Sequence, residues 1–348
     1  MRKIKVLVVD DSALIRQLLT KILGSQANIE VVGTAADPMI AWKKIQECHP
    51  DVLTLDVEMP KMDGLTFLSK LMARRPMPVV MVSSLTLRGA ETTLKALELG
   101  AIDFVEKPSI DIANGTARVS EEIVDKVLIA AASKVRGRSN PVVHVEESPI
   151  LRSSSSLKEA TDKVIAIGAS TGGTEALAQL LPALPSDAPG TVVVQHMPKS
   201  FTTAFAKRLD GLCRMRVKEA EDGDRILRGR VLLAPGDQHM EVVRQGAAYY
   251  VRLNHQPLVN GFRPSVDVLF HSCAHHLGPH VSAAILTGMG RDGAQGMLAM
   301  RDNGAHTIAQ NEETCVVFGM PKEAIAAGGA VMIRPLGQIA RELIRSLN

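Results

Sequence analysis

The chain has 348 residues, of which 46% are hydrophobic and 22% charged, a composition typical of a globular protein with about two domains. Its 40 basic and 37 acidic residues give a net charge of only +3, and 3% of its residues are aromatic, so neither charge nor stacking platforms indicate a nucleic-acid partner. The four cysteines lie far apart with no C-x-x-C pair, which favours reduced thiols in a cytoplasmic protein over a disulfide framework.

The first expected element is a buried strand at residues 4–9. In MRKIKVLVVDD, basic residues precede a short apolar run, and two aspartates end that run, so it is interpreted as a strand and not as a signal peptide. No segment of the chain reaches the roughly 20 apolar residues of a membrane helix, and we expect no membrane insertion.

Strands and helices alternate through the first part of the chain. Ile15, Leu18, Leu19 and Ile22 have the spacing of one helix face, with Ser12 in front of them as a candidate N-cap. Further strands are expected at 30–34, 52–56, 79–83 and 103–105. Because parallel strands need crossover connections, five strands with intervening helices predict a flavodoxin-like, doubly wound α/β domain with a five-stranded parallel sheet.

A helix at 116–133 is expected to end this first domain, which spans 1–133. The stretch that follows is rich in serine, proline and charge without a lasting apolar period, which predicts a linker over 134–160. A second doubly wound α/β domain is expected over 161–348, with strands at 164–168, 191–195, 281–287 and 306–310. The segments RVLLAPGD and AAYYVRL look instead like a short antiparallel hairpin.

Polar residues follow several strands of the first domain. Asp10 and Asp11 follow the first strand, Asp56 ends the third, Ser83 ends the fourth and Lys107 follows the fifth. Residues at these positions meet at one edge of an open parallel sheet, where the carboxylates would repel one another unless a cation such as Mg²⁺ binds between them. Asp and Ser are common in turns after strands, but all five on one edge favour a site for a phosphoryl group.

The motifs VVDDS, LDVEMPKMDG, VSS and VEKP resemble the receiver domain of two-component response regulators over its full length. The resemblance implies that Asp56 is the phosphoacceptor, that a histidine kinase is the phosphodonor, and that phosphorylation switches the domain between two surface arrangements. It also implies a set of roles around Asp56: Mg²⁺ bound by Asp10, Asp11, Asp56 and the Glu58 backbone carbonyl, the phosphoryl group bound by Ser83 and Lys107, and Phe104 at the aromatic switch position.

In the second domain, the first strand VIAIG runs into GASTGG, which places Ser170 in a G-x-S-x-G pattern at a strand-to-helix turn. Glycine-rich turns after strands also bind dinucleotides, but that fingerprint needs G-x-G-x-x-G and an acidic residue at the end of the next strand. Here the next strand ends in Gln195 and His196, so a dehydrogenase is the weaker interpretation.

A serine nucleophile needs a base, and the base needs an orienting acid. His196 follows the strand at 191–195, and Asp292 follows the strand at 281–287, so both are expected beside Ser170 at the carboxyl edge of one sheet. His239 as the base and Asp267 as the acid remain rival assignments. The chain order Ser, His, Asp differs from that of α/β-hydrolases and predicts a different fold with similar chemistry.

Histidines at 271, 275, 276 and 280 surround Cys273, and a zinc site there is conceivable. The segment lacks an H-E-x-x-H glutamate and paired cysteines, so packed or solvated helix histidines are the favoured interpretation.

The motifs IGASTGGTEAL, QHMP, APGDQHM, RPSVDVLF, LTGMGRDGA and IAQNEETCVVFGMP resemble the catalytic domain of the CheB family of chemotaxis protein-glutamate methylesterases. The resemblance implies that Ser170 is the nucleophile, His196 the general base and acid, and Asp292 the residue that orients the imidazole. It places the backbone N–H groups of Thr171 and Met289 in the oxyanion hole, and it implies no cofactor for the esterase chemistry.

The implied function is a phosphorylation-activated serine hydrolase for adaptation in bacterial chemotaxis. It removes methyl groups from glutamyl 5-methyl esters on chemoreceptors, releasing methanol, and deamidates receptor glutamines to glutamate. The alternative from another class is a response regulator whose second domain binds DNA or protein without catalysis. That alternative predicts a basic recognition helix after the linker, and the basic residues there are scattered.

Overall fold

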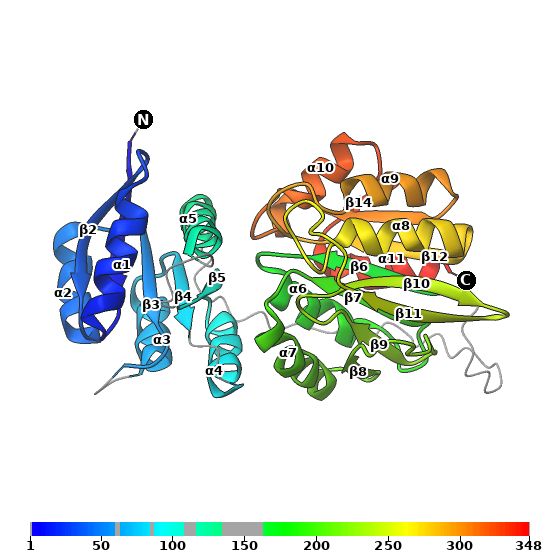
Figure 1. Ribbon diagram of the computed structural model, residues 1–348, viewed down its shortest axis with the longest axis horizontal. Helices are drawn as coiled ribbons and strands as arrows, with labels where there is room; N and C mark the ends of the chain where they lie inside the picture. Colours follow the sequence, from blue (N-terminus) through cyan, green and yellow to red (C-terminus); the bar gives the residue numbers. More distant parts are fainter. Residues whose placement is uncertain (1, 60–62, 84–86, 108–115, 134–162, 348) are drawn as a thin grey trace. The chain divides into compact units, whose positions relative to one another are not determined.

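The computed structural model describes residues 2–59, 63–83, 87–107, 116–133 and 163–347 (Figure 1). The linker expected at 134–160 lies outside the described residues. The chain divides into two compact units, Met1–His144 and Val145–Asn348. In the described ranges, no helix is both long enough and apolar enough to cross a membrane.

The first unit contains a five-stranded parallel sheet in the order β2-β1-β3-β4-β5, which confirms the predicted doubly wound fold. The strands are β1 (Ile4–Val9), β2 (Ile29–Ala35), β3 (Val52–Asp56), β4 (Val79–Ser83) and β5 (Asp103–Glu106). The helices are α1 (Ala13–Gly24), α2 (Pro38–Cys48), α3 (Gly64–Arg74), α4 (Leu87–Glu98) and α5 (Thr116–Ala132).

Local sequence explains these elements. Strands β3 and β4 are buried at every position, as apolar runs must be in a parallel sheet that helices cover on both faces. Helix α1 begins after Ser12, whose hydroxyl accepts a hydrogen bond from the backbone N–H of Ile15, so the predicted N-cap is confirmed. Asp37 caps α2 in the same way, with Pro38 at the first helical position.

The second unit contains a seven-stranded sheet in the order β14-β13-β12-β6-β7-β9-β8, with every pair of neighbours parallel. Its strands are β6 (Val164–Ala169), β7 (Gly190–Gln195), β8 (Arg216–Glu219), β9 (Arg230–Leu233), β12 (Val281–Ile285), β13 (His306–Gln310) and β14 (Met332–Arg334). Separately, β10 (His239–Gln245) and β11 (Ala248–Asn254) form an antiparallel pair.

Six α-helices and three 3-10 turns complete the described part of this unit. The helices are α6 (Gly173–Leu180), α7 (Lys199–Leu212), α8 (Val266–Leu277), α9 (Ala294–Asp302), α10 (Met320–Ala326) and α11 (Leu336–Arg345). The 3-10 turns are η1 (Leu181–Ala183), η2 (Gly278–His280) and η3 (Glu312–Thr314). Helix α8 packs with β10 in a core that also includes side chains of α9, such as Met297 and Met300.

The hairpin prediction was right in kind but wrong in one strand. AAYYVRL does form β11, but its partner is β10, whereas RVLL forms β9 and pairs in parallel with β7 and β8. Three of the four β9 residues are buried, the pattern of a strand inside a parallel sheet. After β9 the chain continues into β10 of the separate pair.

Candidate functional site

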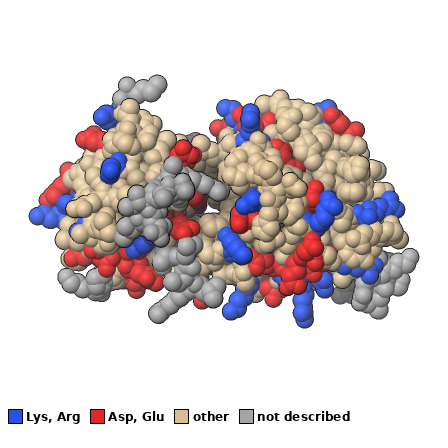
Figure 2. All heavy atoms as spheres, viewed as in Figure 1, with Lys and Arg blue, Asp and Glu red and all other residues tan. Residues whose placement is uncertain are grey.

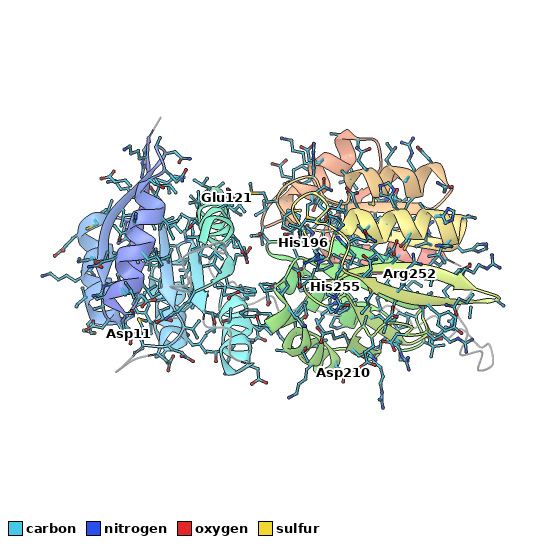
Figure 3. All side chains as sticks on the ribbon, viewed as in Figure 1. Asp11, Glu121, His196, Asp210, Arg252 and His255 are labelled. Atoms are coloured by element: carbon cyan, nitrogen blue, oxygen red, sulfur yellow. The ribbon has the colours of Figure 1, made fainter. Side chains whose placement is uncertain are left out.

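The acidic site lies at the carboxyl ends of β1 and β3, which are neighbours in the first sheet. The chain runs from β1 outward to β2 and then returns to β3 on the other side of β1, so the strand order reverses here, where open α/β sheets bind ligands. Carboxylate oxygens of Asp10, Asp11 and Asp56 all lie within 4.8 Å of one another. Among the described residues, they are the only such group of metal-ligating side chains; Figure 3 labels Asp11.

Lys107 pairs with two of these carboxylates. Its Nζ lies 2.7 Å from Oδ2 of Asp56 and 3.3 Å from Oδ2 of Asp10, although the latter oxygen has no well-directed hydrogen bond. Burial raises the pKa of Asp56 to about 6, against the opposing effect of the Lys107 hydrogen bond. Burial likewise raises the pKa of Asp10. One ammonium therefore does not compensate the buried negative charge, and a divalent cation with oxygen ligands fits the site.

The other predicted receiver residues lie on the neighbouring strands. Ser83 ends β4, is fully buried, and its hydroxyl accepts a hydrogen bond from Thr93 at 2.7 Å. The backbone N–H of Lys107 donates to the carbonyl of Ser83 at 2.8 Å, which brings both residues to one edge. Phe104 on β5 is buried, with the amino group of Lys126 5.0 Å from its ring centroid.

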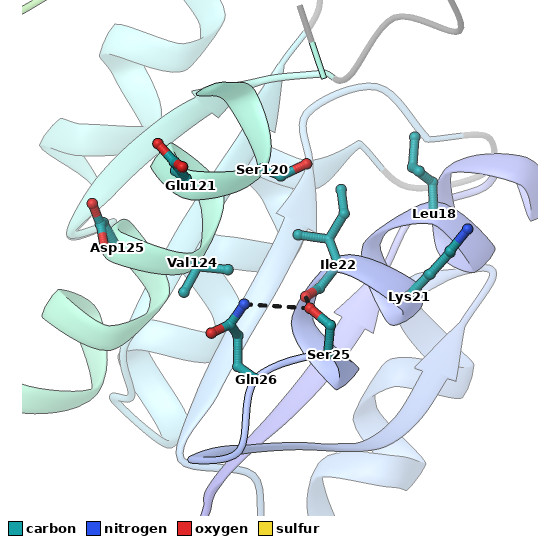
Figure 4. Close-up of a pocket in the computed structure, with 9 residues that line it drawn as sticks. All are labelled: Leu18, Lys21, Ile22, Ser25, Gln26, Ser120, Glu121, Val124 and Asp125. Atoms are coloured by element: carbon teal, nitrogen blue, oxygen red, sulfur yellow. Dashed lines mark hydrogen bonds between the residues drawn. The ribbon is translucent and has the colours of Figure 1, made fainter. Parts of the chain in front are cut away.

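A cavity of ≈ 610 Å³ in the first unit lies apart from this chemistry (Figure 4). It lies between α1 and α5, with Leu18, Ile22 and Val124 on its apolar side and Glu121 and Asp125 on α5. None of its lining residues belongs to the acidic group.

The second candidate site lies at the carboxyl edge of β12, β6 and β7. Strand β6 is central: β7, β9 and β8 lie on one side of it, and β12 pairs on its other side. Ser170 follows β6, His196 follows β7, and Asp292 lies between β12 and α9, so the structure brings all three to one sheet edge. Figure 3 labels His196.

Close packing fixes the turn that carries Ser170. A Cβ atom on Gly288 would lie 2.7 Å from Cβ of Ser170, and one on Gly173 would lie 2.1 Å from Oε1 of Gln195, so only glycine fits at either position. Gln195 is buried, and its Nε2 donates to the carbonyls of Ser170 at 2.9 Å and His196 at 3.1 Å. One amide thus connects the backbones of two predicted catalytic residues.

His196 and Asp292 are hydrogen bonded, with 2.8 Å between Nε2 and Oδ2. Because Nε2 faces the carboxylate, Nδ1 is the nitrogen left for a proton transfer. Within the part of the chain that the structure describes, Nδ1 is buried and has no hydrogen-bond partner. Phe262 stacks on the imidazole at a centroid distance of 3.8 Å and an interplanar angle of 7°.

Asp292 is fully buried, yet it is held as a carboxylate. Burial would raise its pKa, but hydrogen bonds from His196, Asn260 and Ser265 outweigh that effect and lower it. The backbone N–H of Val266, at the start of α8, also donates to Oδ2 at 2.6 Å. The positive end of the α8 dipole therefore adds to the stabilisation of the anion.

The rival residues occupy other positions. His239 is buried, with Nδ1 accepting from the backbone N–H of Ser265 at 3.2 Å and Nε2 bonded to the carbonyl of Pro257 at 3.0 Å. Both ring nitrogens are therefore engaged by backbone groups. Asp267 accepts from Asn260 and from the N–H of Gly296, and burial raises its pKa.

The zinc alternative has no support in the described ranges, where the histidines of α8 form no cluster with metal-ligand spacing. Cys273 points into the core, and burial raises its pKa. On the face of the second unit visible in Figure 2, basic side chains alternate with acidic ones and form no continuous basic patch.

The proposed oxyanion donors lie on two connected backbone segments. The carbonyl of Thr171 accepts from Oγ1 of Thr287 at 3.0 Å, and the same hydroxyl binds the backbone of Val317. Gly288 N–H donates to Val317 at 3.1 Å. These bonds hold the segment before Met289 beside the turn after Ser170. The donor roles of Thr171 and Met289 stay predictions.

Sequence reasoning missed the groups that hold Asp292 and the amide that connects Ser170 with His196. Ser265 precedes the apolar run VDVLF as a helix N-cap would, a signal that could have placed the start of α8. Asn260 precedes a glycine, and Asn-Gly is a strong signal for a tight hairpin turn. Nothing in the sequence indicates the two hydrogen bonds of Gln195.

The profile of the CheB methylesterase family matches residues 165–343, about half of the chain. The chain belongs to this family. A response regulator receiver domain matches residues 6–119, so the CheB-type catalytic domain follows a receiver. The chain is therefore a response regulator with a methylesterase domain, a hydrolase, as its motifs predicted.

Proteins of similar sequence support the CheB assignment. The protein-glutamate methylesterase/protein-glutamine glutaminase 2 of Cupriavidus pinatubonensis is 55% identical, covering 99% of this chain and 96% of that protein. The protein-glutamate methylesterase/protein-glutamine glutaminase of Salmonella typhimurium is 53% identical, covering 100% and 98%. The crystal structure of the Thermotoga maritima CheB methylesterase catalytic domain is 42% identical, with a TM-score of 0.52, and covers 53% of this chain and 97% of that one.

Proposed function

We propose that this chain hydrolyses glutamyl 5-methyl esters on chemoreceptors and deamidates receptor glutamines, with Ser170 as nucleophile, His196 as base and Asp292 as orienting acid. The hydrogen bond between His196 and Asp292, at the strand end beside that of Ser170, is the observation that carries the proposal. A catalytic role explains why a carboxylate and an imidazole nitrogen are buried here, an arrangement that folding alone does not require.

In the first step, Oγ of Ser170 attacks the ester carbonyl carbon while Nδ1 of His196 takes the hydroxyl proton. The resulting oxyanion is stabilised by the N–H groups of Thr171 and Met289. Asp292 stays ionised and stabilises the imidazolium that has formed. When the tetrahedral intermediate collapses, the carbon–oxygen bond to the methoxy group breaks, and His196 returns its proton to the departing methanol.

In the second step, His196 removes a proton from water, and the hydroxide attacks the acyl-Ser170 carbonyl. Collapse of this intermediate breaks the bond to Oγ, which takes back the proton, and glutamate is released. A glutamine side chain follows the same course, with ammonia leaving instead of methanol. The products differ only in the leaving group, so one site serves both reactions.

The receiver would control this chemistry through Asp56. Asp10, Asp11, Asp56 and the backbone carbonyl of Glu58 are the oxygen ligands that would hold Mg²⁺, which when bound neutralises charge on the phosphoryl group. A histidine kinase would donate that group, and Lys107 would pair with its oxygens. Phosphorylation would then shift the receiver to the arrangement that permits hydrolysis at Ser170. We place the reaction in the cytoplasm, with a linker at 134–160 between the domains.

Methanol release from methylated receptor membranes tests both parts. Ser170→Ala is expected to abolish release, whereas Ser186→Ala, an exposed serine, leaves it unchanged. Acetyl phosphate with Mg²⁺ is expected to stimulate the wild-type chain and not Asp56→Asn. Full activity of Ser170→Ala overturns the catalytic assignment, and equal stimulation of both chains overturns the switch.

A further inference from the structure

We propose that Asn260 is a positioning residue for the hydrolysis: its amide holds Asp292 in place and offsets the negative charge that Asp292 and Asp267 place beside His196. The proposal rests on the function proposed above, because it acts through the same imidazole. The observation behind it is one amide group placed between two buried carboxylates, those of Asp292 and Asp267.

A tight turn places the Asn260 side chain. Val259 and Phe262 exchange two backbone hydrogen bonds, of 2.9 and 3.1 Å, across the pair Asn260-Gly261. Both residues of the pair have positive φ, 53° for Asn260 and 85° for Gly261, as a type I′ hairpin turn requires. Asn and Gly are the residues that adopt this conformation most easily, so the backbone here accepts either without strain.

Nδ2 of Asn260 lies 2.8 Å from Oδ1 of Asp292 and 2.7 Å from Oδ2 of Asp267. Since ionised carboxylates only accept hydrogen bonds, the amide must present its NH₂ group and not its oxygen. Each of its two hydrogens then has one acceptor. This side chain therefore connects the predicted triad acid with a second carboxylate on α8.

The electrostatic consequence follows from burial. Asp292 is 0% and Asp267 5% exposed, and each raises the energy of the other's negative charge. The NH₂ of Asn260 offsets that repulsion, and His271 on α8 adds a weaker effect on Asp267. Without the amide, the potential at His196 becomes more negative. The protonated imidazole is then favoured, and a higher pH is needed to obtain the neutral base.

The same turn also contacts the imidazole. Phe262 stacks on the ring of His196 at 3.8 Å with an interplanar angle of 7°, while Asn260, two residues earlier, bonds the acid to which that ring is bonded. The turn thus holds both members of the pair. A loop that only covered the sheet edge would not need to contact both His196 and Asp292.

The test uses two variants that keep the left-handed backbone. Asn260→Gly removes the amide, and Asn260→Asp keeps its shape but replaces a donor by a third acidic group. Gln256→Ala is the matched control, an exposed amide in the same loop whose bond to Asn254 is made by its backbone N–H. For each chain, kcat/KM for methanol release and the rate of Ser170 labelling by a fluorophosphonate are measured from pH 5.5 to 9.

We expect both rates of Asn260→Gly to fall about tenfold at pH 6 and only about twofold at pH 8.5, with a larger acidic loss for Asn260→Asp. Gln256→Ala should follow the wild-type curve. Unchanged pH profiles, or a loss that is uniform across pH, overturn the positioning role. A residue with only a structural role changes the amount of active protein and not the pH midpoint of the two rates. If the wild-type chain itself neither labels at Ser170 nor releases methanol, the proposed function fails, and this inference fails with it.

Discussion

Asp292 bonds His196 through Oδ2, and the same oxygen accepts the backbone N–H of Val266 at the first residue of α8. The carboxylate is therefore fixed by the helix on one side and fixes the imidazole on the other. Because Asp292 accepts from Nε2, the neutral ring carries its proton there, and Nδ1 has the lone pair that a general base needs.

Asp292→Asn is expected to lower kcat about 10³–10⁴-fold with little change in fold. In place of Oδ2, the amide NH₂ would face both Nε2 of His196 and the N–H of Val266. In place of Oδ1, it would face the hydroxyl of Ser265 and the amide of Asn260, so in either orientation a donor opposes a donor. His196 would then adopt the wrong tautomer. Methanol release and circular dichroism measure activity and fold, with the exposed Asp302→Asn as the control. Retention of a tenth or more of wild-type activity would contradict the orienting role.

The sequence was sufficient to place Ser170, His196 and Asp292 at one sheet edge, because parallel strands with crossover helices have their carboxyl ends on one side. It could not show what surrounds Asp292. Ser265 and Asn260 approach it from a loop that precedes α8, and the course of a loop depends on tertiary packing that strand periodicity does not encode.

The two buried histidines should respond differently to the same substitution. His196→Asn is expected to abolish methanol release. His239→Asn should reduce the free energy of unfolding by about 1–3 kcal/mol, because the Pro257 carbonyl loses its donor, while the pH midpoint of kcat/KM stays at the wild-type value. Activity assays at several pH values and denaturant unfolding separate the effects. A shifted midpoint in His239→Asn would restore it as a candidate base.

Gln195→Met tests the amide between Ser170 and His196. Methionine has a similar volume, but both carbonyls would lose the Gln195 donor, and that of Ser170 would keep only the N–H of Gly173. We therefore expect kcat to fall about 10-fold or more, with KM changing less. The loss arises because a small displacement of either backbone misaligns Oγ and Nδ1. Steady-state kinetics measure the change, with the exposed Gln245→Met as control. A rise in KM at constant kcat would instead assign Gln195 to substrate binding.

The error in the hairpin prediction has the same physical origin as the missed contacts, because both depend on tertiary packing. Strand β9 and strand β11 both combine apolar and polar residues over a short length, and the distinction between them lies in burial: β9 is covered on both faces, and β11 alternates. Alternation is hard to recognise in four residues. The three-residue β14 at the sheet edge is shorter still and gave no usable signal.

In the first unit, the buried charge of Asp56 lowers the free energy of unfolding at neutral pH. Asp56 is 1% exposed, and burial raises its pKa from 3.8 to about 6 even though Lys107 donates to it. Between these two values the folded chain keeps a proton that the unfolded chain has lost. The stabilising contribution of protonated Asp56 is therefore present below pH 4 and is lost as the pH rises through 6.

Asp56→Asn is accordingly expected to stabilise the first unit at pH 8 by up to about 3 kcal/mol, with a gain that shrinks towards zero near pH 4. Trp42 is the single tryptophan of the chain and packs edge-on against Phe67 in this unit, so its fluorescence during urea unfolding reports this unit alone. The measurement is made in EDTA, because a bound cation would remove the charge repulsion. Glu30→Gln, which neutralises an exposed carboxylate, should show no such pH-dependent gain. A gain for Asp56→Asn that is equal at pH 4 and pH 8 would show that the ionised Asp56 is not the source of the instability.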